Sequence, residues 1–441
     1  MFNNSKNEIN SSALEVANPP LLWRTHCSSS RSGSLPTFLL SAFSPAGPGL
    51  LAAVSSGPAA SGTGYNSSGP SLDRPLRIIV AGGGTGGHLF PGIAIAQEFA
   101  ARNSATKIIF VSTGNPLEKS VLAGTDFELQ CITAAGIKGR GIGHQLLSAL
   151  KIPKGILESM RILKDFSPDL AIGLGSYSAG PVIIAAWLRR VPIVIQEQNI
   201  LPGITNRILS RFASRIYISF ENTKSNLDSR KVRWTGNPVR RDLLEYSARH
   251  AVEKNDDTGN GFFNVLIIGG SQGAHRINMA VIEALQHLKD KEHLHFIHQT
   301  GEADEQQVNQ AYRRSNIRCT VQSFFDNMAE LYSRADLLIC RAGATTVAEI
   351  TALGKAVIFI PFPYAADNHQ VLNAGSLSDE GAAEMIIEQD LSGEILSAKI
   401  SYYATHREAL NEMAAKARRF GNPDAARHIV DDCYRLISGS T

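Results

Sequence analysis

The sequence predicts an α/β protein with two doubly wound parallel sheets, each in its own Rossmann-like domain. Three observations lead to this prediction. The chain has 441 residues, which at roughly 150 residues per domain is enough for two or three domains. Short apolar runs alternate with helical patterns, as is typical of βαβ units. The alternation stops at Asn237-Pro238 and then starts again, so we expect two sheets that face each other across a cleft.

The strands of both sheets are predicted from apolar runs that are too short for helices and that end in glycine or polar turns. In the first half these runs are residues 76–84, 107–112, 170–175 and 191–197, with helical patterns at 91–102 and 155–166. In the second half they are residues 263–271, 294–301, 335–343 and 355–363. The predicted domains are therefore 75–238 and 239–420, followed by a C-terminal helical segment, 421–441.

Residues 1–74 differ from the rest of the chain. They contain sixteen serines, four basic residues and three acidic residues, and they show no sustained period. Such a composition buries too little apolar surface to order itself, so we predict a disordered extension. Two alternatives stay open: an organellar transit peptide, or a leader without function that an upstream start site adds.

The charge is divided unequally between the two halves. The whole chain has a formal charge of +3, whereas residues 75–238 have 19 basic against 10 acidic residues, and residues 239–441 have 20 against 27. The first half therefore carries +9 and the second −7. A basic half is either an ordinary solvated surface or the binding face for an anionic partner such as a phosphate or a membrane.

Composition excludes several classes of protein. Hydrophobic residues make up 43% and charged residues 19%, which excludes a wholly disordered chain. Five scattered cysteines without a CxxC pair predict a reducing compartment and no metal site. No uncharged apolar run reaches about 18 residues, so no membrane-spanning helix is expected.

The glycine loop after the first strand predicts an anion-binding site. Gly82, Gly84 and Gly87 match GxGxxG between a strand and a helix, where free amides at a helix N-terminus attract anions. A dinucleotide site also needs an acidic residue at the end of the second strand, and residues 110–115 have none. This disfavours a nicotinamide dehydrogenase. His88 follows the glycines and is either a structural residue or a general base, since an imidazole titrates near neutral pH.

Further polar or glycine-rich turns follow other predicted strands, at the strand ends where α/β sites form. Residues 173–181 form a second glycine turn, and Glu197 and Asn199 follow the 191–197 run. In the second half, the hydroxyl of Ser271 and the amides of Gln272 and Gly273 are candidate phosphate ligands. Glu349, inside the helix predicted after residue 343, is a candidate for two ribose hydroxyls. The last turn offers sugar-recognising side chains: Asn368, His369, Gln370 and Asn373.

Together, seven motifs resemble the MurG family of peptidoglycan glycosyltransferases. They are GGTGGHxxPG, GxGSYxxGP, EQN, GNPVR, GGSQGA, RAGATTxAE and DNHQxxNA, in this order over about residues 75–438. The resemblance implies a GT-B fold, with an acceptor domain, a nucleotide-sugar domain and a C-terminal helix that returns to the first domain. It implies an inverting transfer of GlcNAc from UDP-GlcNAc to the 4-hydroxyl of undecaprenyl-pyrophosphoryl-MurNAc-pentapeptide (lipid I), which gives lipid II.

The resemblance also implies roles for single residues. His88 matches the proposed base, with Glu197 as the alternative, and Phe325 matches the position whose backbone meets the uracil edge. Gln196 departs from a histidine that often precedes the EQN glutamate. The positions that match the family's donor-binding residues are Thr85, Gly86, Gly87, Asn199, Arg240, Ser271, Phe325 and Gln370. The residues that match the helix holding the diphosphate and ribose are Ala344, Thr345, Thr346 and Glu349.

Cofactors, partners and location follow from the same resemblance. No metal or other cofactor is implied, and no nucleic acid. The implied partners are UDP-GlcNAc, lipid I, an anionic membrane surface, and other proteins of cell-wall synthesis and division, with a role in cell shape and the cell cycle. The implied location is peripheral, on the cytoplasmic face of the cell membrane, or a plastid if residues 1–74 are a transit peptide.

Two stretches of the first half combine apolar and basic residues, as interfacial surfaces do. The alternative for each is an ordinary amphipathic helix with its apolar face inside the protein. The first, within residues 146–164, consists of Leu146, Leu147, Leu150, Ile152, Ile156 and Leu157 with Lys151, Lys154, Arg161 and Lys164; the second is Trp187 with Arg189 and Arg190.

Three other functions compete with this interpretation. One is a related UDP-sugar transferase with another lipid acceptor, as in plastid galactolipid synthesis. Another is a UDP-GlcNAc epimerase. The third is a non-catalytic scaffold that binds nucleotide sugars.

Overall fold

The computed structural model describes residues 74–134, 142–251, 261–270 and 272–439, all within the compact unit Tyr65–Thr441. The backbone alone is described for residues 142–150. The predictions for residues 1–73 and for Ser271 lie outside the described residues.

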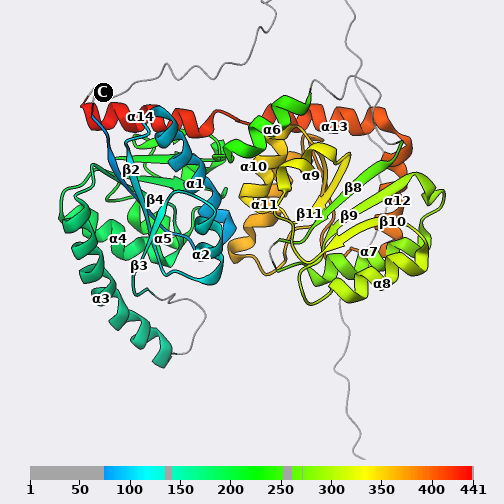
Figure 1. Cartoon of the computed structure of the whole chain (residues 1–441), viewed down its shortest axis with the longest axis horizontal. Coiled ribbons are helices and arrows are strands. Elements are labelled where there is room, and N and C mark those ends of the chain that lie inside the picture. Colours follow the sequence, from blue (N-terminus) through cyan, green and yellow to red (C-terminus); the bar gives the residue numbers. More distant parts are fainter. Residues whose placement is uncertain (1–73, 135–141, 252–260, 271, 440–441) are drawn as a thin grey trace, which may run out of the picture. The chain divides into compact units, whose positions relative to one another are not determined.

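Two parallel sheets form the framework (Figure 1), with strand orders β3-β2-β1-β4-β5-β6-β7 and β10-β9-β8-β11-β12-β13. Both are doubly wound, as expected.

The first domain alternates strands with helices along the chain. Its elements are β1 (Arg77–Ala81), α1 (Gly86–Arg102), β2 (Lys107–Ser112), α2 (Pro116–Ala123), β3 (Glu128–Cys131), α3 (Ile142–Phe166), β4 (Leu170–Gly173), α4 (Ser176–Leu188), β5 (Ile193–Glu197), α5 (Ile204–Leu209), β6 (Arg215–Ile218), the 3₁₀ helix η1 (Glu221–Asn226) and β7 (Val232–Trp234). Apolar side chains cover both faces of this sheet, as a doubly wound arrangement requires.

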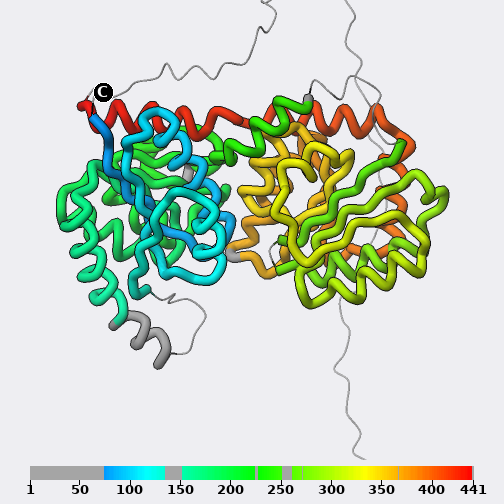
Figure 2. The backbone as a smooth tube through the Cα atoms, viewed as in Figure 1, coloured from blue at the N-terminus to red at the C-terminus, as the bar shows by residue number. Residues whose placement is uncertain are grey.

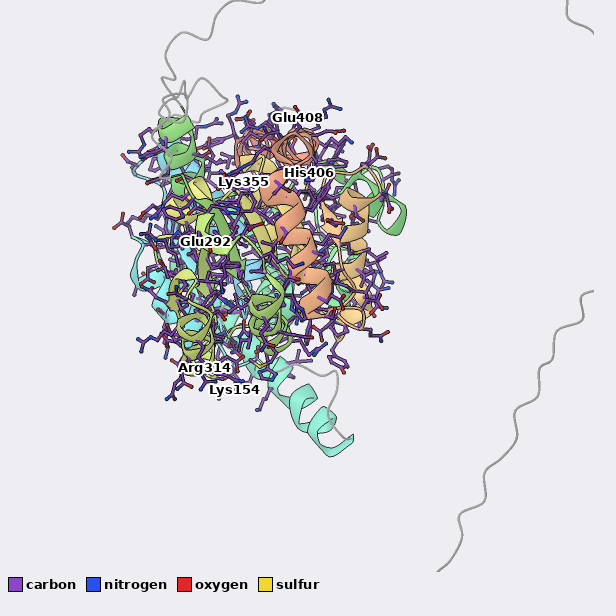
Figure 3. The ribbon with its side chains drawn as sticks, turned by 90° about the vertical axis from the view of Figure 1, so that its right-hand side faces the viewer. Lys154, Glu292, Arg314, Lys355, His406 and Glu408 are labelled. Atoms are coloured by element: carbon purple, nitrogen blue, oxygen red, sulfur yellow. The ribbon has the colours of Figure 1, made fainter. Side chains whose placement is uncertain are left out.

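The second domain repeats this alternation. Its elements are α6 (Arg241–Ala251), β8 (Phe263–Ile268), α7 (His275–His287), η3 (Lys291–His293), β9 (Leu294–Gln299), α8 (Glu305–Ser315), β10 (Arg318–Gln322), α9 (Met328–Arg334), β11 (Leu337–Cys340), α10 (Ala344–Leu353), β12 (Ala356–Phe359), η4 (Ala366–Asn368), α11 (His369–Ser378), β13 (Glu384–Met385), α12 (Gly393–Thr405) and α13 (Arg407–Phe420). The helices α12 and α13 meet at His406, which is labelled in Figure 3.

Every predicted strand is present, although several predicted ranges were too long at their C-terminal ends. For example, the run 263–271 gives β8, which ends at Ile268. The sequence analysis missed β3, β6, β7, β10 and β13. Four of them are edge strands and β6 lies next to one, where polar side chains interrupt the apolar run. In β10, for instance, exposed and partly buried residues alternate.

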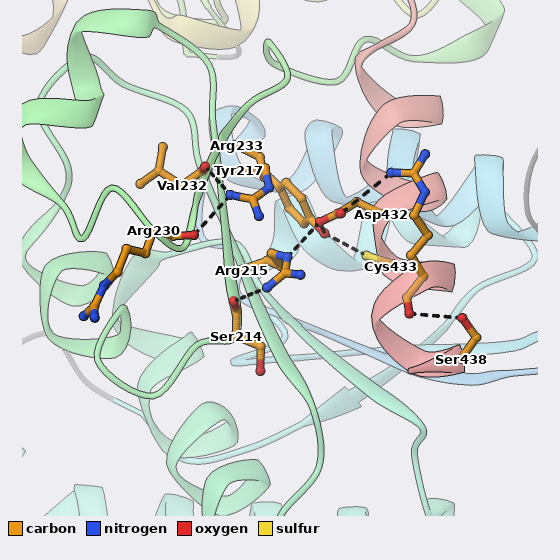
Figure 4. Close-up of polar contacts among 10 residues, drawn as sticks. Ser214, Arg215, Tyr217, Arg230, Val232, Arg233, Asp432, Cys433 and Ser438 are labelled. Atoms are coloured by element: carbon orange, nitrogen blue, oxygen red, sulfur yellow. Dashed lines mark hydrogen bonds and ion pairs between the residues drawn. The ribbon is translucent and has the colours of Figure 1, made fainter. Parts of the chain in front are cut away.

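The last helix, α14 (Ala425–Ser438), packs against the first domain although it follows the second in sequence (Figure 2). Ile429, Val430 and Cys433 are fully buried in the core that covers one face of the first sheet. The Tyr217 hydroxyl of β6 donates to Asp432 over 3.0 Å (Figure 4). Phe99 of α1 contacts the Tyr434 ring at 5.7 Å between centroids.

Candidate functional site

The buried carboxylate of Glu118 holds the glycine loop before α1 in place. Glu118 was not among the site residues predicted from the sequence. Glu118 Oε1 accepts from the Gly84 amide at 2.5 Å and from the Ser112 hydroxyl at 2.6 Å, while Oε2 accepts from the Asn115 amide at 2.9 Å. Glu118 is fully buried, and a Cβ on Gly83 would lie 2.2 Å from its carboxylate. The loop therefore needs glycine at this position because the backbone passes directly over the carboxylate.

His88 lies in the first turn of α1, above the glycine turn that opens α4. Its Nδ1 is 3.1 Å from the Thr85 hydroxyl, and a Cβ on Gly175 would come within 3.3 Å of its ring. Burial lowers the pKa of His88 to about 4, and the nearby His369 contributes. In this state the pKa of His88 therefore lies below the near-neutral value expected from the sequence, because the ring is desolvated, and its role as a base stays a prediction.

The Glu197 carboxylate accepts hydrogen bonds from its own loop. Oε1 accepts from the Asn199 amide at 3.0 Å, and Oε2 accepts from the Gly203 amide at 3.1 Å and the Asn206 side chain at 2.9 Å. The side chain is 1% exposed. Burial raises its pKa, although these hydrogen bonds oppose the shift. In this state Glu197 fixes the EQN loop. Gln196, where the family often has histidine, instead donates to Asn237 at 2.8 Å.

The N-termini of α1 and α10 meet. The Thr345 hydroxyl donates to the carbonyl oxygen of Gly87 at 2.9 Å. Neither helix has a side-chain cap: their N-cap residues are Thr85 and Gly343, and neither makes a side-chain capping hydrogen bond. The first-turn amides of both helices, which include those of Gly86 and of Ala344 to Thr346, therefore lack a side-chain cap and suit an anionic ligand such as a phosphate group.

Arg240 and Glu349 form the centre of this region. The Arg240 guanidinium lies 4.5 Å from the centroid of the Phe90 ring of α1, and its Nη2 is 3.7 Å from Glu349 Oε1. The Tyr332 hydroxyl donates to Glu349 Oε2 at 2.9 Å. Burial raises the pKa of the Glu349 carboxyl, while Arg240 and Tyr332 lower it. The pKa of Glu349 stays above its ordinary value, because Arg240 and Tyr332 offset the effect of burial only in part.

A buried amide links the other two predicted donor loops. Gln299 Nε2 donates to the Gly270 carbonyl at 2.9 Å, and its Oε1 accepts from the Phe325 amide at 3.1 Å. The amide of Phe325 that the resemblance assigns to the uracil edge is therefore engaged by a side chain here. Gln272 is exposed. Gly273 has a φ of +75°, and a Cβ there would lie 1.9 Å from the Thr300 carbonyl oxygen.

Two of the predicted sugar-binding residues of α11, Gln370 and Asn373, differ in burial and in their hydrogen bonds. Gln370 is partly buried and accepts from the Phe362 amide at 2.9 Å. Asn373 is fully buried; its amide donates to Asn199 Oδ1 at 3.4 Å and accepts from the Ile200 amide at 3.4 Å. In this state the side chain of Asn373 therefore joins the two domains, and its recognition of a sugar stays a prediction.

The described residues contain neither a metal-ligand cluster nor a membrane-spanning helix. No three His, Cys, Asp or Glu side chains among them are grouped as metal ligands would be. Within the same part of the chain, no helix combines the length and the apolar character needed to cross a membrane.

Both domains match the same family of enzymes. Residues 78–218 match the glycosyltransferase family 28 N-terminal domain, and residues 264–429 match the glycosyltransferase family 28 C-terminal domain. The crystal structure of MurG from Acinetobacter baumannii superposes with a TM-score of 0.65 at 32% identity, over 83% of this chain and 100% of that one. The chain belongs to the MurG family.

Curated relatives agree with this membership. An Anaeromyxobacter sp. protein is 46% identical over 82% of this chain and 94% of its own length, and one from Syntrophus aciditrophicus is 46% identical over 82% and 99%. Both are named UDP-N-acetylglucosamine–N-acetylmuramyl-(pentapeptide) pyrophosphoryl-undecaprenol N-acetylglucosamine transferase. A UDP-GlcNAc 2-epimerase from Neisseria meningitidis has a TM-score of 0.57 at 16% identity, which shows a shared fold alone.

Membership in the MurG family makes the chain a glycosyltransferase with two Rossmann-like domains, as predicted. The sequence analysis identified the loops of the site but missed Glu118, Gln299 and Tyr332, which hold them in place. One sequence signal was available for Glu118: Asn115, Pro116 and Glu118 have the spacing of a capping box, which α2 forms. That pattern predicts a helix start, but it does not reveal that the glutamate also reaches a loop 34 residues earlier.

Proposed function

We propose that this protein transfers GlcNAc from UDP-GlcNAc to the 4-hydroxyl of MurNAc in lipid I and so produces lipid II. The observation that carries the proposal is the meeting of the α1 and α10 N-termini at the Thr345–Gly87 hydrogen bond, with His88 directly after Gly87 in the sequence. This arrangement puts a candidate base beside amides that suit the leaving diphosphate. The names of curated relatives at 46% identity support the same donor and acceptor.

The chemistry of the leaving group explains why these amides matter. Departure of the sugar leaves a UDP diphosphate with growing negative charge, which preorganised donors stabilise. The first-turn amides of α10 and the guanidinium of Arg240 supply such donors, and Glu349 is the acceptor we assign to the ribose. Arg240 is held by Phe90 and Glu349, so little reorganisation is needed when the charge develops.

We assign the base role to His88 and a positioning role to Glu197. The His88 imidazole is neutral at pH 7 because burial lowers its pKa, and a neutral imidazole can accept the proton of the acceptor hydroxyl. Glu197 is a weaker candidate because three donors already occupy its two oxygens. Its loop carries Asn199, so its effect on donor binding would be indirect.

Contact with an anionic membrane is the second part of the proposal. The outer face of α3 exposes Lys151, Lys154, Leu157 and Arg161 (Lys154 is labelled in Figure 3). Leu157 is 63% exposed, which an amphipathic helix packed only inside the protein does not explain. Ile152 and Ile156 are partly buried, and the side chains of Leu146, Leu147 and Leu150 lie outside the described residues.

A second apolar and basic surface supports the same contact. At the end of α4, Trp187 and Leu188 are 50% and 55% exposed, beside the exposed Arg189 and Arg190. The Trp187 ring lies 5.0 Å from that of Phe212, which follows α5. We propose a peripheral position at the cytoplasmic membrane face, where lipid I and other cell-wall synthesis and division proteins would be met.

The deciding experiment is transfer of labelled GlcNAc to a lipid I analogue by the purified chain, with and without EDTA. We expect a β-1,4-linked product at a rate that EDTA does not change. UDP-galactose should be a poor donor. Preference for UDP-galactose, or binding of UDP-GlcNAc without transfer, would contradict the proposal.

A further inference from the structure

Tyr332 of α9 is buried against the carboxylate that we assign to the ribose. The side chain is 2% exposed, and Glu349 is 7% exposed. The Tyr332 hydroxyl donates to Glu349 Oε2 at 2.9 Å. The other oxygen, Oε1, is 3.7 Å from Arg240 Nη2, a distance too long for a good hydrogen bond. Oε1 can therefore still accept a hydrogen bond from a ligand hydroxyl.

The position of Tyr332 in the fold connects two parts of the donor site. Its helix α9 follows directly after the segment that contains Phe325, whose backbone we assign to the uracil edge, while Glu349 lies on α10. Both residues belong to the apolar core on one face of the second sheet or border it. A single hydrogen bond thus joins the segment assigned to the base with the helix assigned to the ribose and diphosphate.

We propose that Tyr332 is a positioning residue for nucleotide recognition, which orients Glu349 so that Oε1 accepts from the ribose hydroxyls. The inference rests on the proposed function, because it takes the donor to be a UDP-sugar. Arg240 alone cannot supply this orientation, since its ion pair with Oε1 leaves the carboxylate free to rotate. The tyrosine hydroxyl fixes the rotation by holding the opposite oxygen.

The chemistry of the tyrosine suits this task. Burial and the neighbouring Glu349 raise the pKa of Tyr332 well above its ordinary value, so the hydroxyl remains a donor at working pH. A hydrogen bond to a carboxylate is also stronger than one between neutral groups. Glu349 is the only acceptor recorded for this hydroxyl among the described residues.

The test is Tyr332→Phe, which removes one oxygen and keeps the ring in the core. The matched control is Tyr312→Phe on α8, because Tyr312 is also fully buried but contacts His298 at 3.3 Å in the core on the other face of the sheet. Both full-length variants are assayed with a lipid I analogue and with two donors, UDP-GlcNAc and its 2′-deoxyribose analogue.

We expect the wild-type chain to prefer UDP-GlcNAc over the 2′-deoxyribose analogue by about tenfold or more in kcat/KM, the ratio for one hydrogen bond to a charged group. In Tyr332→Phe this preference should fall to about twofold or less, with a higher KM for UDP-GlcNAc and a nearly unchanged kcat. Tyr312→Phe should keep the wild-type preference. A merely structural role would change stability or kcat but not the ribose preference.

Three results would overturn the inference in different ways. If Tyr332→Phe keeps the wild-type preference, Tyr332 has no positioning role, although the proposed function stands. If Glu349→Gln, measured as a second variant, keeps the preference, the assigned carboxylate is wrong. If the wild-type chain transfers no GlcNAc at all, the proposed function itself fails and the inference fails with it.

Discussion

Two buried glutamates, Glu118 and Glu197, hold the loops of the first domain in the same way. Each carboxylate accepts from two backbone amides and one side chain, and both are almost fully buried. A buried carboxylate is stable when hydrogen bonds replace its lost hydration. The loops therefore have a defined shape before any substrate arrives, which lowers the cost of ordering them on binding.

Replacement of Glu118 by glutamine tests this role. The amide would place an N–H group against donors that need an acceptor, so we expect about 1–3 kcal/mol loss of stability and a lower kcat/KM. Urea unfolding and transfer assays measure the two effects. Glu128→Gln is the control, because Glu128 is exposed and, within the described part of the chain, its carboxylate accepts a hydrogen bond from the Gln130 side chain alone. Equal effects of both changes would argue against a special role for Glu118.

His88→Ala is expected to lower turnover by at least about 10²-fold, the low end for a general base. The affinity for UDP-GlcNAc, measured by calorimetry, should change little because the first-turn amides remain. Thr85→Val is the companion variant: it removes the hydroxyl 3.1 Å from Nδ1 but keeps the imidazole, so its loss should be smaller. Turnover of His88→Ala equal to that of the wild type would exclude the base role.

The pH dependence of kcat/KM provides an independent test of His88. A base is active when unprotonated, so activity should fall as the pH drops below its pKa in the free enzyme. Burial lowers this pKa from 6.5 to about 4, and the acidic limb should therefore lie near pH 4. The limb of kcat should lie higher, because the negative charge of bound diphosphates raises the pKa of a nearby imidazole. A kcat/KM limb near 6.5 would show that the ring is solvated in the free enzyme.

Charged and hydrogen-bonded side chains attach α14 to the first domain, which is distant from it in sequence. Arg102 of α1 is 3% exposed and pairs with Asp431 at 2.6 Å and with Glu98 at 2.9 Å. Arg215 lies 3.3 Å from Asp432, which also accepts from Tyr217 (Figure 4). The amphipathic pattern of the segment predicts a helix. The resemblance implied that this helix returns to the first domain, and the paired charges with the apolar core beneath them show which side chains attach it there.

Asp431→Asn should weaken this attachment. The change leaves the buried Arg102 with one carboxylate instead of two, for which we expect a loss of roughly 2–3 kcal/mol in unfolding free energy. Urea denaturation followed by circular dichroism measures it. Glu412→Gln on α13 is the matched control, because that exposed carboxylate pairs only with Lys416, and its unfolding midpoint should not move. A similar midpoint in all three proteins would contradict a stabilising role for the Arg102 pair.

For the whole molecule, the charge difference between the two halves gives a clear prediction. The +9 of residues 75–238 includes the exposed cations of α3 and of the end of α4. The double change Lys151→Glu/Lys154→Glu should lower co-sedimentation with anionic vesicles severalfold, since each cation near such a surface contributes about 1 kcal/mol. The control is Arg313→Glu/Arg314→Glu on α8, an equal charge reversal in the other domain, which should leave vesicle binding nearly intact. Unchanged binding of the Lys151/Lys154 variant would refute the membrane surface.

The sequence by itself determined the fold class, most central strands and the glycine loops of the site. These features are local: buried parallel strands need apolar runs, and a tight approach to a helix N-terminus needs glycine. Gly82 and Gly84, for example, have φ values of +119° and +90°, which few other residues adopt.

Only the tertiary structure decided how the loops are held and which predicted site residues already have hydrogen-bond partners within the protein. Glu118, Gln299 and Tyr332 act through partners between 17 and 34 positions away in sequence, and no local pattern encodes those pairings. The lowered pKa of His88 and the burial of Asn373 have the same origin. Both depend on what surrounds the side chain in space, and that is set by the packing of the two sheets rather than by neighbouring residues.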